Sequence, residues 1–157
     1  WRTDYLQGKL YAATGRFGEA AEAFRRTLRR RPAQLDALNS LAAAILKGGG
    51  DPREAEAALL RAVEIAPYAP TAYFNLGLLE LGRGRSEAAR RRFEEVLDRQ
   101  PRHGAAHYYL GTTLLGRPAA ARGHFQRARE AGFDVAGALR REHPQLAADP
   151  AWAEFFR

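Results

Sequence analysis

Residues 73–101 read YFNLGLLELGRGRSEAARRRFEEVLDRQP, and this stretch is one copy of a unit that recurs along the chain. Within it, the small residue Gly77 precedes a second small residue, Ala89, which is followed by Phe93 and then by a closing Pro101. Small residues equivalent to Gly77 occur at spacings of 34, 35 and 34 residues; they are Gly8, Ala42, Gly77 and Gly111. A fixed period of this length predicts an array of repeated structural units.

The other markers of the unit keep the same period. Each of four alanines is followed four residues later by a large apolar residue; the pairs are Ala20 and Phe24, Ala55 and Leu59, Ala89 and Phe93, and Ala121 and Phe125. We expect the small residues to lie where two helices of a unit cross, so that the backbones can approach. We expect the large residues to fill the gap to the next unit, because a single unit cannot bury its apolar face alone.

Each unit is predicted to form two helices. Apolar residues recur at three- and four-residue steps in the first half of each unit, and glycines follow them. Pro32, Pro67 and Pro101 disfavour helical geometry in the residue before them and so end the second helices. The expected first helices cover 3–14, 37–47, 71–81 and 105–115, and the expected second helices cover 18–30, 52–65, 86–99 and 119–131.

The pattern resembles that of tetratricopeptide repeats, W-x2-L-G-x2-Y…A-x3-F…P, over about residues 1–132. None of the four units has the family's tryptophan; Asp4, Leu38, Tyr73 and His107 take its place. The resemblance implies an all-α fold, a right-handed α-solenoid of four helix-turn-helix repeats. The repeats would cover about 1–34, 35–69, 70–103 and 104–132, followed by C-terminal capping helices in 133–157.

The last 25 residues, 133–157, lose the period. We expect a short amphipathic helix near 134–142 and a last helix opened by Asp149-Pro150 that carries Trp152, Phe155 and Phe156. The main interpretation is a cap over the end of the array. The alternative is an exposed aromatic anchor for a partner, since such side chains often dominate interfaces.

The composition of the chain excludes several kinds of site and segment. The chain has 157 residues, about one domain, and no cysteine, which excludes disulfides, thiolate metal sites and a cysteine nucleophile. It has no methionine, so we expect it to be a trimmed piece, with a leader, an anchor or further sequence upstream. The longest apolar run, 41–46, is far shorter than the ~20 residues of a membrane span. The cytoplasm and the periplasm or cell envelope both stay open as locations.

The net charge of +7 comes from 23 Arg and 2 Lys against 18 acidic residues. The abundance of Arg and Ala is typical of GC-rich codon usage and favours a bacterial source. Arginines crowd two of the second helices; those weighed as a secondary interface are Arg25, Arg29, Arg30, Arg90 and Arg91, together with Trp152, Phe155 and Phe156. Because the stacking aromatics fall on other helices than the Arg clusters, nucleic acid is an unfavoured partner. A solvated face, an acidic protein and an anionic lipid surface are the other interpretations.

No convincing catalytic set is present, so we predict no enzyme activity, no cofactor and no metal. His103 and His107 stand four residues apart, a spacing that two metal ligands on one helix could use. His107, however, takes the place of the family's core tryptophan, which favours a packed histidine. Gly48-Gly49-Gly50 lacks the Lys and Ser/Thr of a phosphate loop and is predicted to be a turn.

By resemblance to the family, the first helices line a concave groove that takes a peptide or a helix. The predicted groove residues are Tyr5, Lys9, Asn39, Phe74, Asn75, Tyr108, Tyr109 and Thr112. Their alternative role is packing against neighbouring helices. Family members that grip a chaperone's C-terminal carboxylate use Lys, Arg and Asn at several groove positions. Only Lys9 is basic at those places here, so we expect no such clamp.

The sequence therefore predicts a non-catalytic scaffold or adaptor that binds protein partners, as a subunit of a larger complex. The alternative is the interaction domain of an envelope assembly factor whose membrane anchor lies upstream. Contact with a membrane is expected only through such an upstream segment or an anionic surface.

Overall fold

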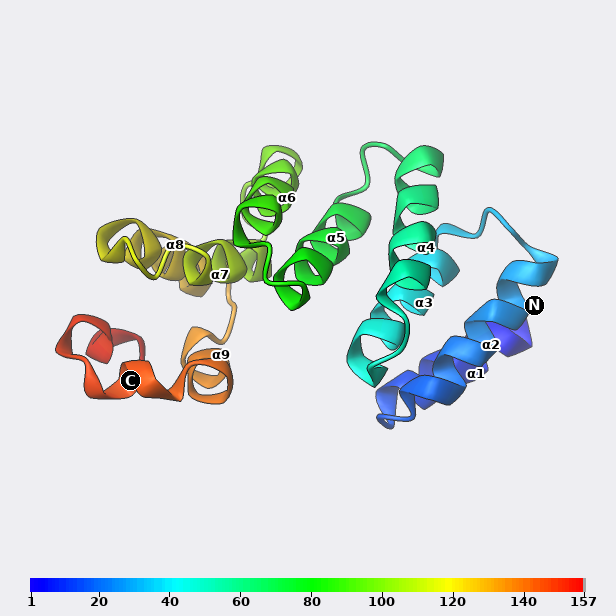
Figure 1. The fold of residues 1–157 in the computed structure, drawn as a ribbon, viewed down its shortest axis with the longest axis horizontal. Helices are drawn as coiled ribbons and strands as arrows, with labels where there is room; N and C mark the ends of the chain where they lie inside the picture. The colour runs from blue at the N-terminus through cyan, green and yellow to red at the C-terminus, as the bar shows by residue number, and fades with distance from the viewer. Residues whose placement is uncertain (157) are drawn as a thin grey trace. The chain divides into compact units, whose positions relative to one another are not determined.

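The structure is a computed structural model that describes residues 1–156, which are helical with no strand (Figure 1). The chain divides into two compact units, Trp1–Gly84 and Arg85–Arg157. Unit 1 contains α1 (Arg2–Ala13), α2 (Phe17–Arg30), α3 (Leu35–Gly48), α4 (Pro52–Ile65) and α5 (Pro70–Gly82). Unit 2 contains α6 (Ser86–Arg99), α7 (Gly104–Thr112), α8 (Pro118–Glu130), α9 (Val135–Glu142) and the 3-10 helices η1 (Pro144–Ala148) and η2 (Pro150–Phe155).

The all-α fold built from helix pairs is confirmed, and seven of the eight predicted repeat helices agree with the structure to within two residues at both ends. The exception is α7, which ends at Thr112 rather than at the predicted 115. The hydroxyls of Thr112 and Thr113 donate hydrogen bonds to the carbonyls of Tyr109 and Leu110, both at 2.7 Å. Such side-chain bonds compete with the backbone ladder, and Leu114 N–H then bonds to Gly111 three residues back.

Local signals set the turns of unit 1. Gly49 follows α3 with φ of 69°, a left-handed conformation that glycine adopts without strain. Asp51 then caps α4, because its side chain accepts a hydrogen bond from the Arg53 backbone N–H at 2.8 Å. Pro52 occupies the first turn of α4, where its missing N–H costs nothing.

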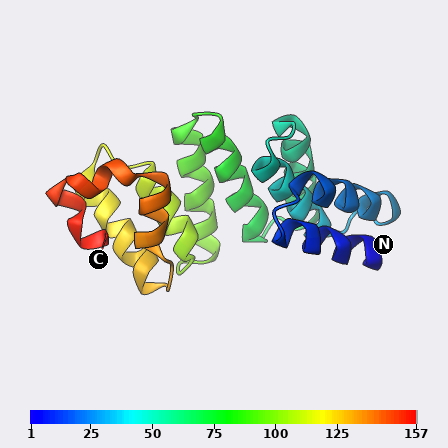
Figure 2. The ribbon, with the colours of Figure 1, turned by 90° about the horizontal axis from the view of Figure 1, so that it is seen from below.

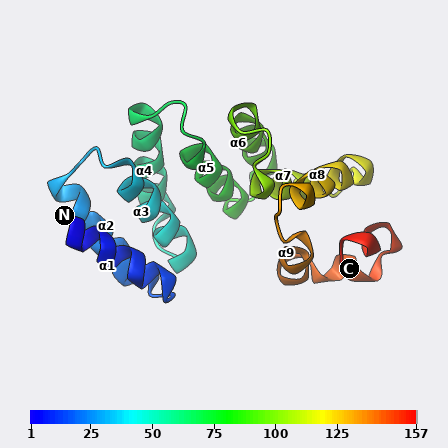
Figure 3. The same cartoon turned by 180° about the vertical axis from the view of Figure 1, so that it is seen from behind.

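Two of the hairpins close where an aromatic ring meets a glycine. In the α1/α2 hairpin, whose helices run side by side in Figures 1 and 3, a Cβ built on Gly8 would lie 2.5 Å from Cε1 of Phe24. In the α7/α8 hairpin, a Cβ on Gly111 would lie 2.6 Å from Cε1 of Phe125. The small residues therefore do lie at the crossings, as predicted. The aromatic rings fill their own hairpin as well as the space toward neighbouring elements, a contact that the periodicity did not predict.

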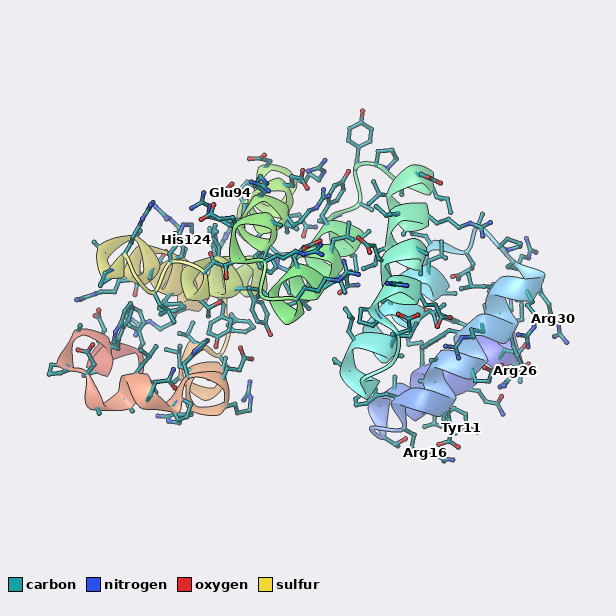
Figure 4. All side chains as sticks on the ribbon, in the orientation of Figure 1. Tyr11, Arg16, Arg26, Arg30, Glu94 and His124 are labelled. Atoms are coloured by element: carbon teal, nitrogen blue, oxygen red, sulfur yellow. The ribbon has the colours of Figure 1, made fainter. Side chains whose placement is uncertain are left out.

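Ion pairs join the helices of unit 1. Arg25 of α2 reaches Glu54 of α4 with two hydrogen bonds of 2.7 Å, and this contact lowers the pKa of the Glu54 carboxyl. Asp4 of α1 lies 3.2 Å from Arg26 and 3.3 Å from Arg30, which extend from α2 (Figure 4). At the loop end of the same hairpin, the Arg16 guanidinium lies 4.5 Å from the Tyr11 ring centre. Both residues are labelled in Figure 4.

The C-terminal segment of unit 2 is a cap. Trp152 and Phe155 are 2% and 3% exposed, and their rings meet the Phe125 ring edge-on at 5.8 and 5.5 Å between centroids. Figure 2 shows α9 and η2 beside α8. This packing agrees with the expected capping role. The alternative, an exposed aromatic anchor, does not agree with this burial, because two of its three rings are removed from solvent. Phe156, the third, is half-buried.

Candidate partner-binding face

An open cavity of about 230 Å³ lies between α1 and α3 on the face formed by the first helices of unit 1. We call it the α1/α3 pocket. Its lining comes from α1, the start and middle of α2, and α3; the residues are Lys9, Ala12, Phe17, Phe24, Ser40, Ala43, Ala44 and Lys47. The predicted groove position Lys9 is therefore at a real depression. Lys47 and Phe17 were not predicted to be site residues.

The inner part of the pocket is apolar. Phe24 and Ala44 are 1% and 3% exposed, so they belong to the core of unit 1, and Phe17 is half-buried. Small side chains at Ala12 and Ala43 keep the space between α1 and α3 open, since larger residues there would occupy it. An apolar side chain of a ligand would lose contact with water by entering, and this burial is favourable.

The rim of the pocket is polar and positively charged. Lys9 and Lys47 are exposed, and their ammonium groups lie 6.0 Å from the Tyr5 ring and 5.9 Å from the Phe17 ring. Neither lysine has a carboxylate within ion-pair distance in residues 1–156. The hydroxyl of Ser40, which is half-buried on α3, adds a group that can both donate and accept a hydrogen bond.

The other predicted groove residues of unit 1 are partly or largely covered. Tyr5 is half-buried and lies 5.8 Å from Phe24, ring centre to ring centre. Asn39 and Asn75 are each 8% exposed, and Phe74 is half-buried. The Oδ1 atom of Asn39 is buried with no hydrogen-bond partner among the described residues. A buried acceptor without a donor lowers the stability of the folded chain, because it has lost its hydrogen bonds to water and gained none in the protein.

In unit 2, Tyr108 does not line an open groove, contrary to the prediction. It is 0% exposed, lies 5.0 Å from the Phe133 ring, and donates a hydrogen bond to Glu142 of α9 at 3.2 Å. Burial, with the Glu142 charge adding to it, raises the pKa of the Tyr108 hydroxyl. The C-terminal segment thus covers this position. Tyr109 is half-buried and donates to the same carboxylate at 3.4 Å, and the Thr112 hydroxyl is used within α7.

The arginines weighed as a secondary interface are mostly paired with carboxylates. Arg25 binds Glu54 and Glu22, Arg29 lies 3.8 Å from Glu22, and Arg30 lies 3.3 Å from Asp4. In unit 2, Arg90 lies 2.6 Å from Glu87 and 3.7 Å from Glu94. Arg91 is exposed and forms no ion pair within the described chain. Pairing reduces the positive field of these helices, which favours the solvated-face interpretation.

Two histidines meet in the α7/α8 hairpin. The Nδ1 atoms of His107 and His124 lie 3.1 Å apart, and Nε2 of His107 lies 2.9 Å from the carbonyl oxygen of Pro101. Burial lowers the pKa of His124 to about 4, with His107 and Arg127 adding to the effect. His107 is packed, as predicted, while His103 caps α7 by accepting from the Ala106 N–H. Within residues 1–156 no group of three or more ligating side chains could hold a metal ion.

Sequence reasoning missed His124 and Lys47 for different reasons. His124 lies seventeen residues beyond His107, so their contact depends on the register of a hairpin and not on helical spacing. Lys47 could have been found, because the chain has only two lysines and both lie on expected first helices.

The paired helices and the glycine–aromatic joints together define a helical repeat protein. A family model described as tetratricopeptide repeat matches residues 5–70 and 74–136, and the chain belongs to this family. No curated protein matches the chain. No helix within residues 1–156 combines the length and the apolar character needed to cross a membrane.

Solved structures share the fold. The structure is similar to TTC0263, a thermophilic TPR protein of Thermus thermophilus, with a TM-score of 0.82 and 22% identity, covering 98% of this chain and 85% of that one. It is similar to MamA, residues 41 to the end, from Desulfovibrio magneticus RS-1, with a TM-score of 0.70 and 26% identity, over 82% and 73% of the two chains. The first TPR of Spaghetti (RPAP3), bound to the HSP90 peptide SRMEEVD, gives a TM-score of 0.68 and 20% identity, over 73% and 90%.

Proposed function

We propose that this chain is a non-catalytic scaffold that binds a peptide segment of a protein partner at the α1/α3 pocket, within a larger assembly. The observation that carries the proposal is the pocket itself, which is open, has an apolar interior and has polar groups at its rim. This is the usual make-up of a recognition site, where apolar contact supplies affinity and a few polar groups supply orientation.

The buried amide of Asn39 supports a ligand with a polypeptide backbone. Asn39 lies one helical turn before Ala43, which lines the pocket, and its acceptor has no donor in the described residues. A backbone N–H is the kind of donor that would satisfy this acceptor, and each residue of a bound segment other than proline carries one. A peptide ligand is compatible with this fold, since the first TPR of Spaghetti (RPAP3) was solved with a bound HSP90 peptide.

A pocket-filling variant tests the proposal. A photo-crosslinking residue, p-benzoylphenylalanine, is placed at Asp36, which is exposed on α3 one turn before Ser40 and outside the pocket lining. Crosslinked products from source-cell extract are compared with and without Ala43→Trp. Ala57→Trp is the matched control, because Ala57 is exposed on α4 outside the pocket. We expect discrete crosslinked proteins that disappear with Ala43→Trp and persist with Ala57→Trp. Products that are unchanged by Ala43→Trp, with both variants folded by circular dichroism, would refute the proposed interface.

A further inference from the structure

This inference rests on the proposed function. We infer that the partner segment carries acidic residues beside a large apolar residue. The apolar side chain would enter the α1/α3 pocket, and one or two carboxylates beside it would lie against Lys9 and Lys47. The ligand class is thus an acidic–apolar peptide segment.

The placement of the lysines is the first argument. The chain has 25 basic residues, of which two are lysines, and both line the same pocket. Arg25 and Arg83 of unit 1 bind carboxylates of their own chain, whereas the two lysines, like Arg53 and Arg61 on α4, have none in residues 1–156. Among the unpaired cations of unit 1, the two lysines are the ones that line the pocket. Lys47 also lies in the last turn of α3, where a cation is favoured by the helix dipole. Lys9 lies in the middle of α1, so the dipole does not account for it.

The volume of the cavity indicates how large an apolar group of the ligand it can hold. A volume of about 230 Å³ is below the ~300–1,000 Å³ typical of sites for whole small molecules. It suits one large side chain held by a chain that continues along the surface. The aromatic walls, Phe17 and Phe24, favour an aromatic or a branched aliphatic residue there, since ring contacts add to the gain from burial.

The negative charge of Asp36 on the same face constrains where an acidic residue of the ligand can bind. Asp36 is exposed in the first turn of α3, eleven residues before Lys47, which is about 16 Å along the helix axis. A carboxylate of the ligand is therefore attracted to the lysine end of the pocket and repelled at the Asp36 end. The face selects a segment whose acidic residues are grouped on one side of the apolar one, and does not select a uniformly acidic chain.

A random twelve-residue peptide library displayed on phage tests this inference without knowledge of the partner. Selection is carried out on the full chain, on Lys9→Glu/Lys47→Glu, and on Ala43→Trp. A second charge-reversed variant, Arg53→Glu/Arg61→Glu, makes the same change in net charge at exposed positions of α4 outside the pocket. Circular dichroism confirms that all four proteins have the same helix content.

We expect wild type and the α4 variant to enrich peptides with Asp or Glu beside a large apolar residue. The lysine variant should lose this acidic bias and bind the wild-type peptides about tenfold more weakly, because attraction becomes repulsion at two sites. Pocket-dependent peptides without acidic bias would overturn the acidic chemistry and leave the proposed interface standing. If Ala43→Trp enriches the same peptides as wild type, the pocket is not the interface, and the proposed function fails with the inference.

Discussion

Replacing Gly8 with alanine tests the joint that closes the first hairpin. The added Cβ would lie 2.5, 2.8 and 2.9 Å from three atoms of the Phe24 ring, distances that real contacts do not reach. Phe24 is 1% exposed, so its ring cannot swing into solvent without opening the core of unit 1. The substitution must therefore push α1 and α2 apart or force the ring into a strained position.

The magnitude follows from two opposing effects. Overpacking of this kind costs about 1–3 kcal/mol, while alanine in place of glycine inside a helix gains about 1 kcal/mol. Gly18→Ala on α2 isolates the gain, because no atom lies within 4 Å of its added Cβ. We expect the Gly8→Ala protein to be about 1–3 kcal/mol less stable than the Gly18→Ala protein. Gly111→Ala should show the same deficit relative to Gly123→Ala, whose nearest atom is at 3.9 Å.

Thermal unfolding followed by circular dichroism in the far ultraviolet is the assay. For a chain of this size about 1 kcal/mol corresponds to about 2–4 °C, so a deficit of a few degrees or more is expected. Phe24→Leu in the Gly8→Ala background should recover part of the loss, since the shorter side chain removes the clash. If Gly8→Ala melts at or above the temperature of Gly18→Ala, the glycine is not required by the ring, and the account of the joint is wrong.

Three further outcomes are expected. Glu54→Gln should lower the free energy of unfolding by up to about 1 kcal/mol at neutral pH and leave it unchanged in acid. Arg25 lowers the pKa of the Glu54 carboxyl, so the stabilisation by this ion pair is lost as pH falls through that pKa. Urea titrations at several pH values measure the difference. Trp152→Ala should destabilise the cap by about 3–5 kcal/mol by uncovering Phe125, seen as faster hydrogen exchange in α8 and η2. His124→Gln should reduce the pH dependence of the free energy of unfolding between pH 4 and 6.5. The wild-type protein loses stability as pH falls through this range, because the His124 imidazole is protonated near pH 6.5 in the unfolded chain and only near pH 4 in the folded chain.

The sequence predicts the features that repeat and misses those that occur once. Gly8 and Phe24 recur with a fixed period, so the helix pairs and their crossings follow from spacing alone. The early end of α7 depends on two threonine hydroxyls that bond to their own helix, a choice that composition does not reveal. The burial of Tyr108 depends on Phe133 and Glu142 in the non-repeating C-terminal segment, whose path no periodicity fixes.

The glycine–aromatic joint has a consequence for how such chains change over generations. Gly8 with Phe24 and Gly111 with Phe125 close two separate hairpins by the same contact, and none of the four residues is exposed. A hairpin that carries this joint can be duplicated or recombined as a gene segment and still fold against its own second helix. Residues such as Lys9 and Ser40 are outside the joint, so drift at those positions can alter what the protein binds while the hairpin stays intact.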